Sequence, residues 1–274
     1  MNMQDIHALL EPVSALVRSV RPLMDDRSAD RSVTVKGDSD FVTAADLAVQ
    51  QALETGLRTL RPDFAFMGEE SAMHTIDPAV PTWVIDPIDG TTNFIHRYAF
   101  SAISVGLVLG GEPIFGIVFN PYLDELFAAV KGFGATCNGQ PISVSPLDHF
   151  DTALVGIGTM PYYKEKTSDT FRLWCSLFNA GADIRRSGSA ALDVCYVAAG
   201  RMDVFAEPSL GSWDFAASSI ILREAGGTLT DWHNTHLACD GHRHSVAASN
   251  GKLHQTLLDF IINADVMATT EIDD

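Results

Sequence analysis

Residues 101–130 place the strongest constraint on the fold, because three strand-like runs follow one another there with almost no sequence between them. The runs are 101–109, 113–120 and 124–130, and Gly110-Gly111 and Asn120-Pro121 supply the turns. Connections this short join antiparallel neighbours, since a parallel pair needs a long crossover. Helices and strands alternate in the rest of the chain. We therefore expect an α/β chain with mixed sheets around an antiparallel meander.

Helical and strand-like segments flank the meander on both sides. Residues 4–24 carry apolar side chains at helical spacing and predict one amphipathic helix. Thr43 to Asp46 resembles a capping box that opens a second helix, and Arg61-Pro62 ends it. The other predictions are strands at 64–67, 83–85, 153–157, 182–185, 203–206 and 228–231, and helices at 168–180, 189–199 and 213–225. The region near 145–150 has no linker-like composition, so the halves, about 1–148 and about 149–274, should pack as a single unit.

The composition is that of an ordinary globular chain with a large acidic excess. Of 274 residues 46% are hydrophobic, and 35 acidic residues against 18 basic ones give a formal net charge of −17. This charge argues against nucleic acid or an anionic membrane surface as a partner. A small anionic substrate is still compatible with it, because a bound cation reverses the potential locally.

The remaining bulk features indicate a cytoplasmic protein. The N-terminus lacks the pattern of a secretory signal. The apolar uncharged run from Tyr98 to Gly111 is too short to span a bilayer. Four widely separated cysteines form no CxxC pair, so we expect them to be reduced rather than joined in disulfides.

The segment WVIDPIDGTTNF, residues 83–94, leads a buried strand directly into two carboxylates, Asp86 and Asp89. Pro87 should end the strand and turn the chain, so that both carboxylates project toward one point. Gly90 permits a close backbone approach, and the Thr-Thr-Asn that follows offers N–H groups at a predicted helix start, where anions bind. Oxygen ligands for a cation beside donors for an anion fit a metal-bound phosphate, and oxygen-only ligands favour Mg²⁺ or Mn²⁺.

Three further acidic residues stand where a strand ends or a helix begins, and each also has an ordinary structural interpretation. Asp46 could be only the acidic member of its capping box. Glu69, with Glu70, could form a solvated turn. Asp214 could be a carboxylate favoured by the dipole in the first turn of a helix. None of them indicates a site when taken alone.

Four motifs carry a family resemblance: DFVTAAD (40–46), GEES (68–71), WVIDPIDGTTNF (83–94) and SWDFAASSIILREAGG (212–227). In this order and spacing the chain resembles the inositol monophosphatase family of Mg²⁺-dependent, lithium-sensitive phosphatases over roughly residues 5–260. WVIDPIDGTTNF is highly specific, whereas GEES or WDFAA alone would be weak. The resemblance implies an α/β fold of the α+β type, a layered αβαβα sandwich with mixed, largely antiparallel sheets like those of the inositol monophosphatases and sugar phosphatases.

The resemblance also implies roles for the matching residues. The implied ligands of one Mg²⁺ are Glu69, Asp86 and the Ile88 carbonyl, and those of a second are Asp86, Asp89 and Asp214. Glu69 would also bind a weaker third ion through water, and Mn²⁺ could replace Mg²⁺. The implied catalytic residues are Asp46 and Thr91, which would orient and help deprotonate an attacking water, together with Glu69.

The substrate side of the implied site draws on both halves of the chain. The implied phosphate and substrate contacts are Asp89, Gly90, Thr91, Thr92, Gly188, Ser189, Ala190 and Glu207. Thr159 matches a further substrate position. Lys36 would lie in a loop that approaches the site, although Asp38 adds negative charge where relatives often carry a longer, basic loop.

We therefore expect a Mg²⁺-dependent phosphomonoesterase that uses a metal-activated water on a small polyol phosphate, with inositol 1-phosphate as the first candidate. Glu207 would accept hydrogen bonds from ring hydroxyls, but it would equally suit an amine-bearing alcohol. Histidinol phosphate is thus the main rival substrate, and relatives also use fructose 1,6-bisphosphate and 3′-phosphoadenosine 5′-phosphate. The resemblance implies a homodimer. A non-catalytic pseudoenzyme would have lost a metal ligand or the water-activating pair, and this chain retains them all.

Three other features could indicate sites of a different kind. The stretch 231–244 contains four histidines and Cys239, but its spacing fits no zinc pattern and its Asn, Asp and Gly favour a surface turn. Ser187-Gly188-Ser189 lacks the GxSxG elbow of a nucleophilic serine. Arg185-Arg186 could bind substrate, contact a neighbouring subunit or simply face solvent.

Overall fold

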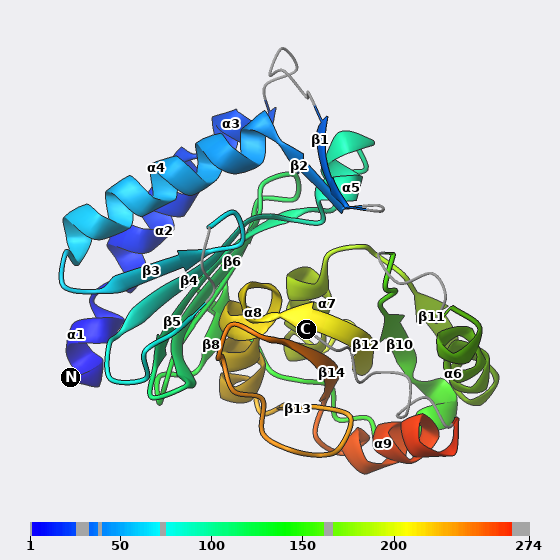
Figure 1. The fold of residues 1–274 in the computed structure, drawn as a ribbon. Coiled ribbons are helices and arrows are strands. Elements are labelled where there is room, and N and C mark those ends of the chain that lie inside the picture. The colour runs from blue at the N-terminus through cyan, green and yellow to red at the C-terminus, as the bar shows by residue number, and fades with distance from the viewer. Residues whose placement is uncertain (1, 26–32, 38–39, 72–74, 162–166, 265–274) are drawn as a thin grey trace.

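The computed structural model describes residues 2–25, 33–37, 40–71, 75–161 and 167–264. Within them the chain forms alternating layers of helices and sheets (Figure 1). The first layer contains α1 (Met3–His7), α2 (Leu10–Ser19), α3 (Arg21–Asp25) and α4 (Ala44–Leu60). The middle helices are α7 (Ala190–Ala198) and α8 (Ser212–Glu224), and the outer ones α6 (Thr167–Ala180) and α9 (His254–Asn263). A sheet separates each pair of helical layers, which confirms the αβαβα arrangement.

The first sheet has seven strands in the order β3-β4-β5-β6-β7-β8-β9. They are β3 (Ala65–Gly68), β4 (Thr82–Asp89), β5 (Ala102–Leu109), β6 (Glu112–Asn120), β7 (Glu125–Val130), β8 (Ala135–Cys137) and β9 (Gln140–Pro141). β3 and β4 are parallel and all other neighbours are antiparallel. The predicted meander is confirmed as β5-β6-β7, in which Val105 is opposite Ile117.

The second sheet has five strands in the order β11-β10-β12-β14-β13. They are β10 (Leu154–Ile157), β11 (Asp183–Arg185), β12 (Val204–Gly211), β13 (Thr228–Thr230) and β14 (Arg243–Ser249). β10 pairs in parallel with β11 and β12, and the other pairs are antiparallel. Both sheets are thus mixed, but only the first is largely antiparallel, because the second has two parallel and two antiparallel pairs. A short hairpin of β1 (Val33–Gly37) and β2 (Asp40–Thr43) lies beside α5 (Thr91–Ile95) in Figure 1.

The prediction of a single helix over residues 4–24 is wrong, because that segment forms the three helices α1, α2 and α3. Prolines explain both interruptions. Pro12 has no N–H for the carbonyl of Ala8, and Pro22 has none for the carbonyl of Arg18, so a continuous ladder of helical hydrogen bonds cannot pass either point. The apolar face survives the breaks, since Ile6 of α1 is buried like Val13 and Val17 of α2.

The prediction that Pro87 ends its strand is also wrong. β4 continues to Asp89, and its register against β5 shifts by one residue after Asp86, which is opposite Ser104 while Asp89 is opposite Ala102. A bulge of this kind tolerates a proline and redirects the side chains that follow. β12 likewise runs beyond the predicted 203–206, through an irregularity between Glu207 and Leu210.

Other elements were not expected from the sequence. The hairpin β1-β2 replaces the loop expected around Lys36, and strands β8, β9 and β14 and helix α9 were not predicted. A short 3-10 helix, Phe150–Thr152, follows the region near 145–150 where we divide the chain. The single-unit organisation of the two halves stays a prediction.

Three groups of buried apolar residues fill the spaces between the layers. One lies between the first helices and the seven-stranded sheet, one between the two sheets around α7 and α8, and one between the five-stranded sheet and α6 and α9. α8 approaches the first sheet closely at Gly116, which has no Cβ. A Cβ at this position would lie 2.2 Å from the Ala217 carbonyl oxygen and would clash with it. No helix in the described part of the chain is both long and apolar enough to cross a membrane.

Candidate active site

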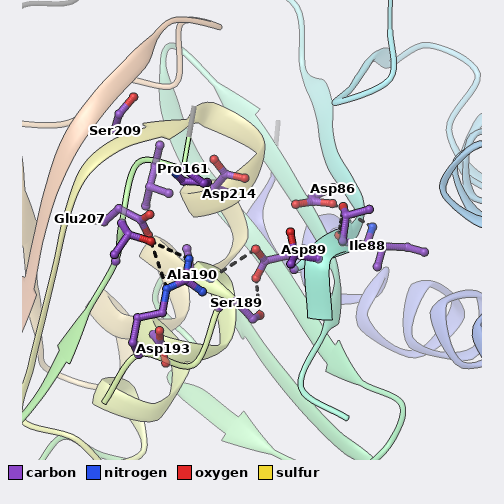
Figure 2. Close-up of a pocket in the computed structure, with 18 of the residues that line it drawn as sticks. Asp86, Ile88, Asp89, Pro161, Ser189, Ala190, Asp193, Glu207, Ser209 and Asp214 are labelled. Atoms are coloured by element: carbon purple, nitrogen blue, oxygen red, sulfur yellow. Dashed lines mark hydrogen bonds between the residues drawn. The ribbon is translucent and has the colours of Figure 1, made fainter. Parts of the chain in front are cut away.

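Asp86 and Asp89 lie at the irregular end of β4, and both are buried. The Asp86 Oδ1 atom accepts a hydrogen bond from the Ile88 backbone N–H at 2.8 Å, which fixes the orientation of the carboxylate. Figure 2 shows Asp86, Ile88 and Asp89 together at one side of a cavity. The bulge thus places both carboxylates at the same side of the cavity, as the sequence predicts. The two residues lie within β4, however, and not beyond its end.

Asp89 is held by the first turn of α7, about one hundred residues further along the chain. Its Oδ2 atom accepts hydrogen bonds from the Ser189 hydroxyl and from the Ala191 N–H at 2.9 Å. Its Oδ1 atom accepts from the Ala190 N–H at 3.3 Å. The carboxylate therefore supplies the acceptor that the N-terminus of α7 needs. The predicted contact residues Ser189 and Ala190 meet Asp89 directly.

Asp46 is both a helix cap and a member of the site. Its Oδ2 atom accepts from the backbone N–H of Thr43 at 2.8 Å and from the Thr43 hydroxyl, so the predicted capping box is confirmed. Its Oδ1 atom lies 3.4 Å from the Thr91 hydroxyl, which is also 3.2 Å from the Ile88 carbonyl oxygen. One oxygen thus serves the helix while the other faces Thr91.

Asp214 comes from the first turn of α8 and reaches the same point. Its Oδ2 atom accepts the Gly211 N–H at 2.7 Å. Asp86, Asp89 and Asp214 each offer an oxygen, and these oxygens all lie within 4.8 Å of one another. Glu69, whose N–H bonds the Ile85 carbonyl at 2.9 Å, follows β3 beside them and lines the same cavity.

The cavity has a volume of about 370 Å³ and brings nearly all of the predicted residues together. The predicted residues that line it are Glu69, Asp86, Ile88, Asp89, Gly90, Thr91, Thr92, Thr159, Gly188, Ser189, Ala190, Glu207 and Asp214. Gly90 has φ +91°, and a Cβ there would lie 2.8 Å from the Gly188 carbonyl oxygen. This position therefore requires glycine, since only glycine allows α5 to begin against the Gly188 turn.

Mutual repulsion and burial raise the pKa values of the converging carboxylates. Burial raises the pKa of Asp86 well above its usual range, and Glu69, Asp89 and Asp214 raise it further. Burial and the neighbouring Asp214 raise the pKa of Asp89 to about 7, against the hydrogen bonds from α7. Burial raises the pKa of Asp46 to about 6. The folded chain thus holds several carboxylates at a cost that a cation would offset.

The donor set fits a hard divalent cation. The converging groups are carboxylate oxygens, with the Ile88 carbonyl beside them, and no histidine or cysteine side chain belongs to the group found among the described residues. Oxygen ligands of this kind suit Mg²⁺ or Mn²⁺ better than zinc or copper. The repulsion of Asp86 by Glu69, Asp89 and Asp214 supports the same interpretation, because a bound cation would relieve it.

Several cavity residues are missing from the set predicted for the site. Pro161, Asp193, Ser209 and Arg243 line it, and Arg186, considered only as one of several alternatives, points to it as well. Arg243 donates to the Ser209 hydroxyl at 3.0 Å and opposes the rise in the pKa of Asp214. The position of Arg186 after a strand and beside a glycine turn could have marked it as a candidate site residue. Its hydrogen-bond partner, Thr159, lies 27 residues away in the sequence, so local patterns do not reveal the contact.

Other predictions fall outside this arrangement. Lys36 lies in β1, and its side chain, like Asp38, is outside the described residues. In the 231–244 stretch, His236 contacts Glu112 and His244 contacts Asp240, each at 2.9 Å, so these histidines face different partners. The four cysteines are free, as expected. The Ser187 hydroxyl donates a hydrogen bond to the buried Asp193 at 2.6 Å. This contact gives Ser187 a structural role and does not support its interpretation as a nucleophile.

Comparisons with known proteins agree with this geometry. A family model described as the inositol monophosphatase family matches residues 5–264. An inositol-1-monophosphatase of Synechocystis sp. is 40% identical over 220 residues, which cover 80% of this chain and 75% of that relative. A Salmonella typhimurium protein named Nus factor SuhB is 40% identical over 202 residues, which cover 73% of this chain and 75% of that protein.

Solved structures give the same result. The structure of inositol monophosphatase from Anabaena (Nostoc) sp. has a TM-score of 0.83 and 31% identity, and the match covers 97% of this chain and 99% of that one. The Thermotoga maritima inositol monophosphatase has a TM-score of 0.85 and 31% identity, with 96% and 99% covered. The chain therefore belongs to the inositol monophosphatase family of phosphatases.

Proposed function

We propose that this chain is a Mg²⁺-dependent phosphomonoesterase that hydrolyses a small polyol phosphate, with inositol 1-phosphate as its substrate. The observation that carries the proposal is the convergence of Asp86, Asp89 and Asp214, whose oxygens lie within 4.8 Å of one another. A buried cluster of carboxylates beside a cavity large enough for a small phosphate ester suits metal-dependent hydrolysis.

We assign the cation ligands as two overlapping sets. Glu69, Asp86 and the Ile88 carbonyl would hold one Mg²⁺, and Asp86, Asp89 and Asp214 would hold a second, with a weaker third ion near Glu69. When bound, the ions supply positive charge that lowers the pKa of water and attracts phosphate oxygens. Mn²⁺ is expected to replace Mg²⁺, because its ligand preferences are similar.

Asp46 and Thr91 are assigned to the attacking water. The Thr91 hydroxyl lies between Asp46 Oδ1 and the Ile88 carbonyl, so it can donate to Asp46 while its oxygen accepts a hydrogen bond from water. A pKa of about 6 leaves Asp46 mostly ionised at neutral pH, and a carboxylate in that state accepts a proton. Because both residues are held by backbone contacts, water would be oriented before phosphate binds.

The other cavity residues are assigned to the ester. The backbone N–H groups of Gly90 and Thr91, with Thr92 beside them, would bind the phosphate. Gly188, Ser189, Ala190 and Glu207 would contact the alcohol, and Thr159 lies on the same wall. Glu207 is buried and accepts hydrogen bonds when ionised, so it suits the hydroxyl groups of a polyol.

The wider biology follows the same line of argument. We propose a cytoplasmic location, which the four free cysteines favour, and a homodimer, which the resemblance implies. The relative named Nus factor shows that family members differ in their roles. The net charge of −17 favours a small-molecule substrate over nucleic acid or an anionic membrane as the partner of this chain.

A kinetic panel tests the proposal. Phosphate release is measured with Mg²⁺ for inositol 1-phosphate, histidinol phosphate, fructose 1,6-bisphosphate and 3′-phosphoadenosine 5′-phosphate, and the values of kcat/KM are compared. The largest value is expected for inositol 1-phosphate. Absence of phosphate release from every ester would contradict the enzymatic proposal, whereas a larger value for histidinol phosphate would assign the enzyme to its main rival substrate.

A further inference from the structure

The buried Glu207 and the exposed Arg186 both line the cavity that we assign to the ester. Glu207 lies across the cavity from Asp86 in Figure 2. Arg186 lines the same cavity, and it is the positive charge that opposes the rise in the pKa of the buried Glu207. Asp214, Asp193 and Asp89 act in the opposite direction.

The Arg186 guanidinium is anchored on one residue, Thr159. Its Nε and Nη2 atoms donate to the Thr159 hydroxyl oxygen at 3.2 and 2.9 Å. Its Nη1 atom lies 2.4 Å from the position that a Cβ would take on Gly188, so the absence of a side chain there makes room for it. A guanidinium does not lose its proton in a protein, and therefore the positive charge at this place is permanent.

Glu207 is fixed next to the same anchor. A Cβ on Gly158 would lie 2.0 Å from Glu207 Cδ, so the carboxyl group packs directly on the Gly158 backbone. The Gly158 N–H donates to the Ala206 carbonyl at 2.9 Å, which ties this segment to β12. Glu207 and the anchor of Arg186 thus rest on successive residues, Gly158 and Thr159.

We propose that Arg186 makes the enzyme discriminate against phosphate esters whose alcohol part carries a positive charge. The inference rests on the proposed phosphatase function and deepens it. An ammonium group would approach Glu207 beside a guanidinium that can neither deprotonate nor move away without losing its hydrogen bonds to Thr159, and like charges at such contacts are strongly unfavourable. A neutral polyol meets donors on Arg186 and acceptors on Glu207, and so it satisfies both groups.

The chain supplies a matched control for this charge. Arg185 precedes Arg186, but its Nη1 atom pairs with Asp183 at 2.6 Å, and the residue does not line the active-site cavity. Replacing Arg185 by glutamine removes the same charge from the adjacent position. It should therefore leave the choice of substrate unchanged.

The experiment compares kcat/KM for inositol 1-phosphate and histidinol phosphate in the wild type, R186Q, R186K and R185Q, with Mg²⁺ present. In R186Q the ratio is expected to shift toward histidinol phosphate by about 10-fold or more, since a repelling charge is lost together with donors to the polyol. R185Q should shift the ratio by less than about 2-fold, because Arg185 does not line the active-site cavity and is paired with Asp183. R186K retains the charge and should still disfavour the amine.

The outcomes separate the two claims. If the wild type hydrolyses neither ester, the proposed function fails, and the inference that rests on it fails too. If the wild type is active and R186Q leaves the ratio unchanged, or R185Q shifts it equally, the role of Arg186 is overturned while the phosphatase function stands. Should R186Q not fold, T159V releases the guanidinium without removing its charge, and a ratio unaltered by that change would also contradict the inference.

Discussion

Three carboxylates of the site, Asp46, Asp86 and Asp214, share one local feature: each uses an oxygen to accept a nearby backbone N–H. Asp86 accepts from Ile88, Asp46 from Thr43 and Asp214 from Gly211, at 2.7 to 2.8 Å. These bonds fix the side chains before any cation binds and leave the second oxygen of each group for the site. For Asp46 the helix cap is confirmed, and its other oxygen faces Thr91, so the structure is compatible with the catalytic role, which stays a prediction.

Asp86→Asn separates charge from geometry at this position. The amide oxygen can still accept the Ile88 N–H, while the loss of one charge relieves repulsion from Glu69, Asp89 and Asp214. We expect phosphate release to fall more than about 100-fold, since even partners one step removed from a metal contribute 10- to 100-fold. The free energy of unfolding without metal should be unchanged or higher. Urea unfolding in EDTA and a phosphate assay check this, and near wild-type activity would exclude Asp86 as a shared ligand.

Asp193, which we do not assign as a metal ligand, predicts a pH dependence of stability. Burial raises the pKa of Asp193 to about 8, so the folded state keeps its proton between about pH 4 and pH 8 while the unfolded state releases it. The unfolded state then binds fewer protons, and stability falls as pH rises through that range, by about 1.4 kcal/mol per pH unit for this group.

The variant Asp193→Asn should remove that part of the pH dependence. Its amide can still accept from Ser187, so near pH 5 the variant and the wild type should be similarly stable. Near pH 9 the variant should be the more stable of the two. Chemical unfolding at both values measures the difference. Identical pH profiles for the two proteins would show that Asp193 is already ionised in the folded state at neutral pH.

At the scale of the elements, α8 connects the site to the first sheet. It carries Asp214 in its first turn and packs on β5 and β6 through two glycines, Gly106 and Gly116. A Cβ on Gly106 would lie 3.0 Å from the Ala216 Cβ, and one on Gly116 would lie 2.2 Å from the Ala217 carbonyl oxygen. The close approach of this helix therefore sets where the Asp214 carboxylate stands relative to Asp86.

Gly116→Ala should displace α8 from the sheet. The added methyl group meets backbone and Ile220, which cannot move independently of the helix, so we expect a loss of about 1–3 kcal/mol of stability. Activity at saturating Mg²⁺ should fall as well, because Asp214 moves with α8. Gly110→Ala provides a control for an added methyl group, since a Cβ there meets nothing within 4 Å, although its φ of +67° carries its own strain. Unchanged stability of Gly116→Ala would contradict this packing role.

Patterns among residues close together in the sequence predicted many of the helices and strands. The contacts between residues far apart in the sequence could not be predicted in this way. The capping box at Thr43, the meander and most helices of the second half follow from residues close together in sequence. The bond from Ser189 to Asp89 joins residues 100 apart, and the bond from Arg186 to Thr159 depends on how β10 and β11 pair. Such partners depend on the tertiary fold, and therefore only the resemblance to the family, which extends beyond its four motifs, pointed to the positions around Ser189.

The whole molecule places the site where its two sheets come together. β4 and α4 contribute Asp86, Asp89 and Asp46 from the first half, whereas α7 and α8 contribute the partners of Asp89 and Asp214 from the second. Asn93 joins the halves further, because its Nδ2 atom donates to the Phe100 and Ser187 carbonyls at 2.7 and 2.8 Å. Site and core are thus assembled together, and cation binding should stabilise the whole fold.

The Mg²⁺ dependence of phosphate release from inositol 1-phosphate tests the central claim most directly. The wild type is assayed in EDTA and then at increasing Mg²⁺, with thermal unfolding followed on the same samples. We expect no phosphate release in EDTA, activity that rises and saturates with Mg²⁺, and a parallel rise in Tm. Equal release in EDTA and in Mg²⁺, or no release at any Mg²⁺ concentration, would contradict it.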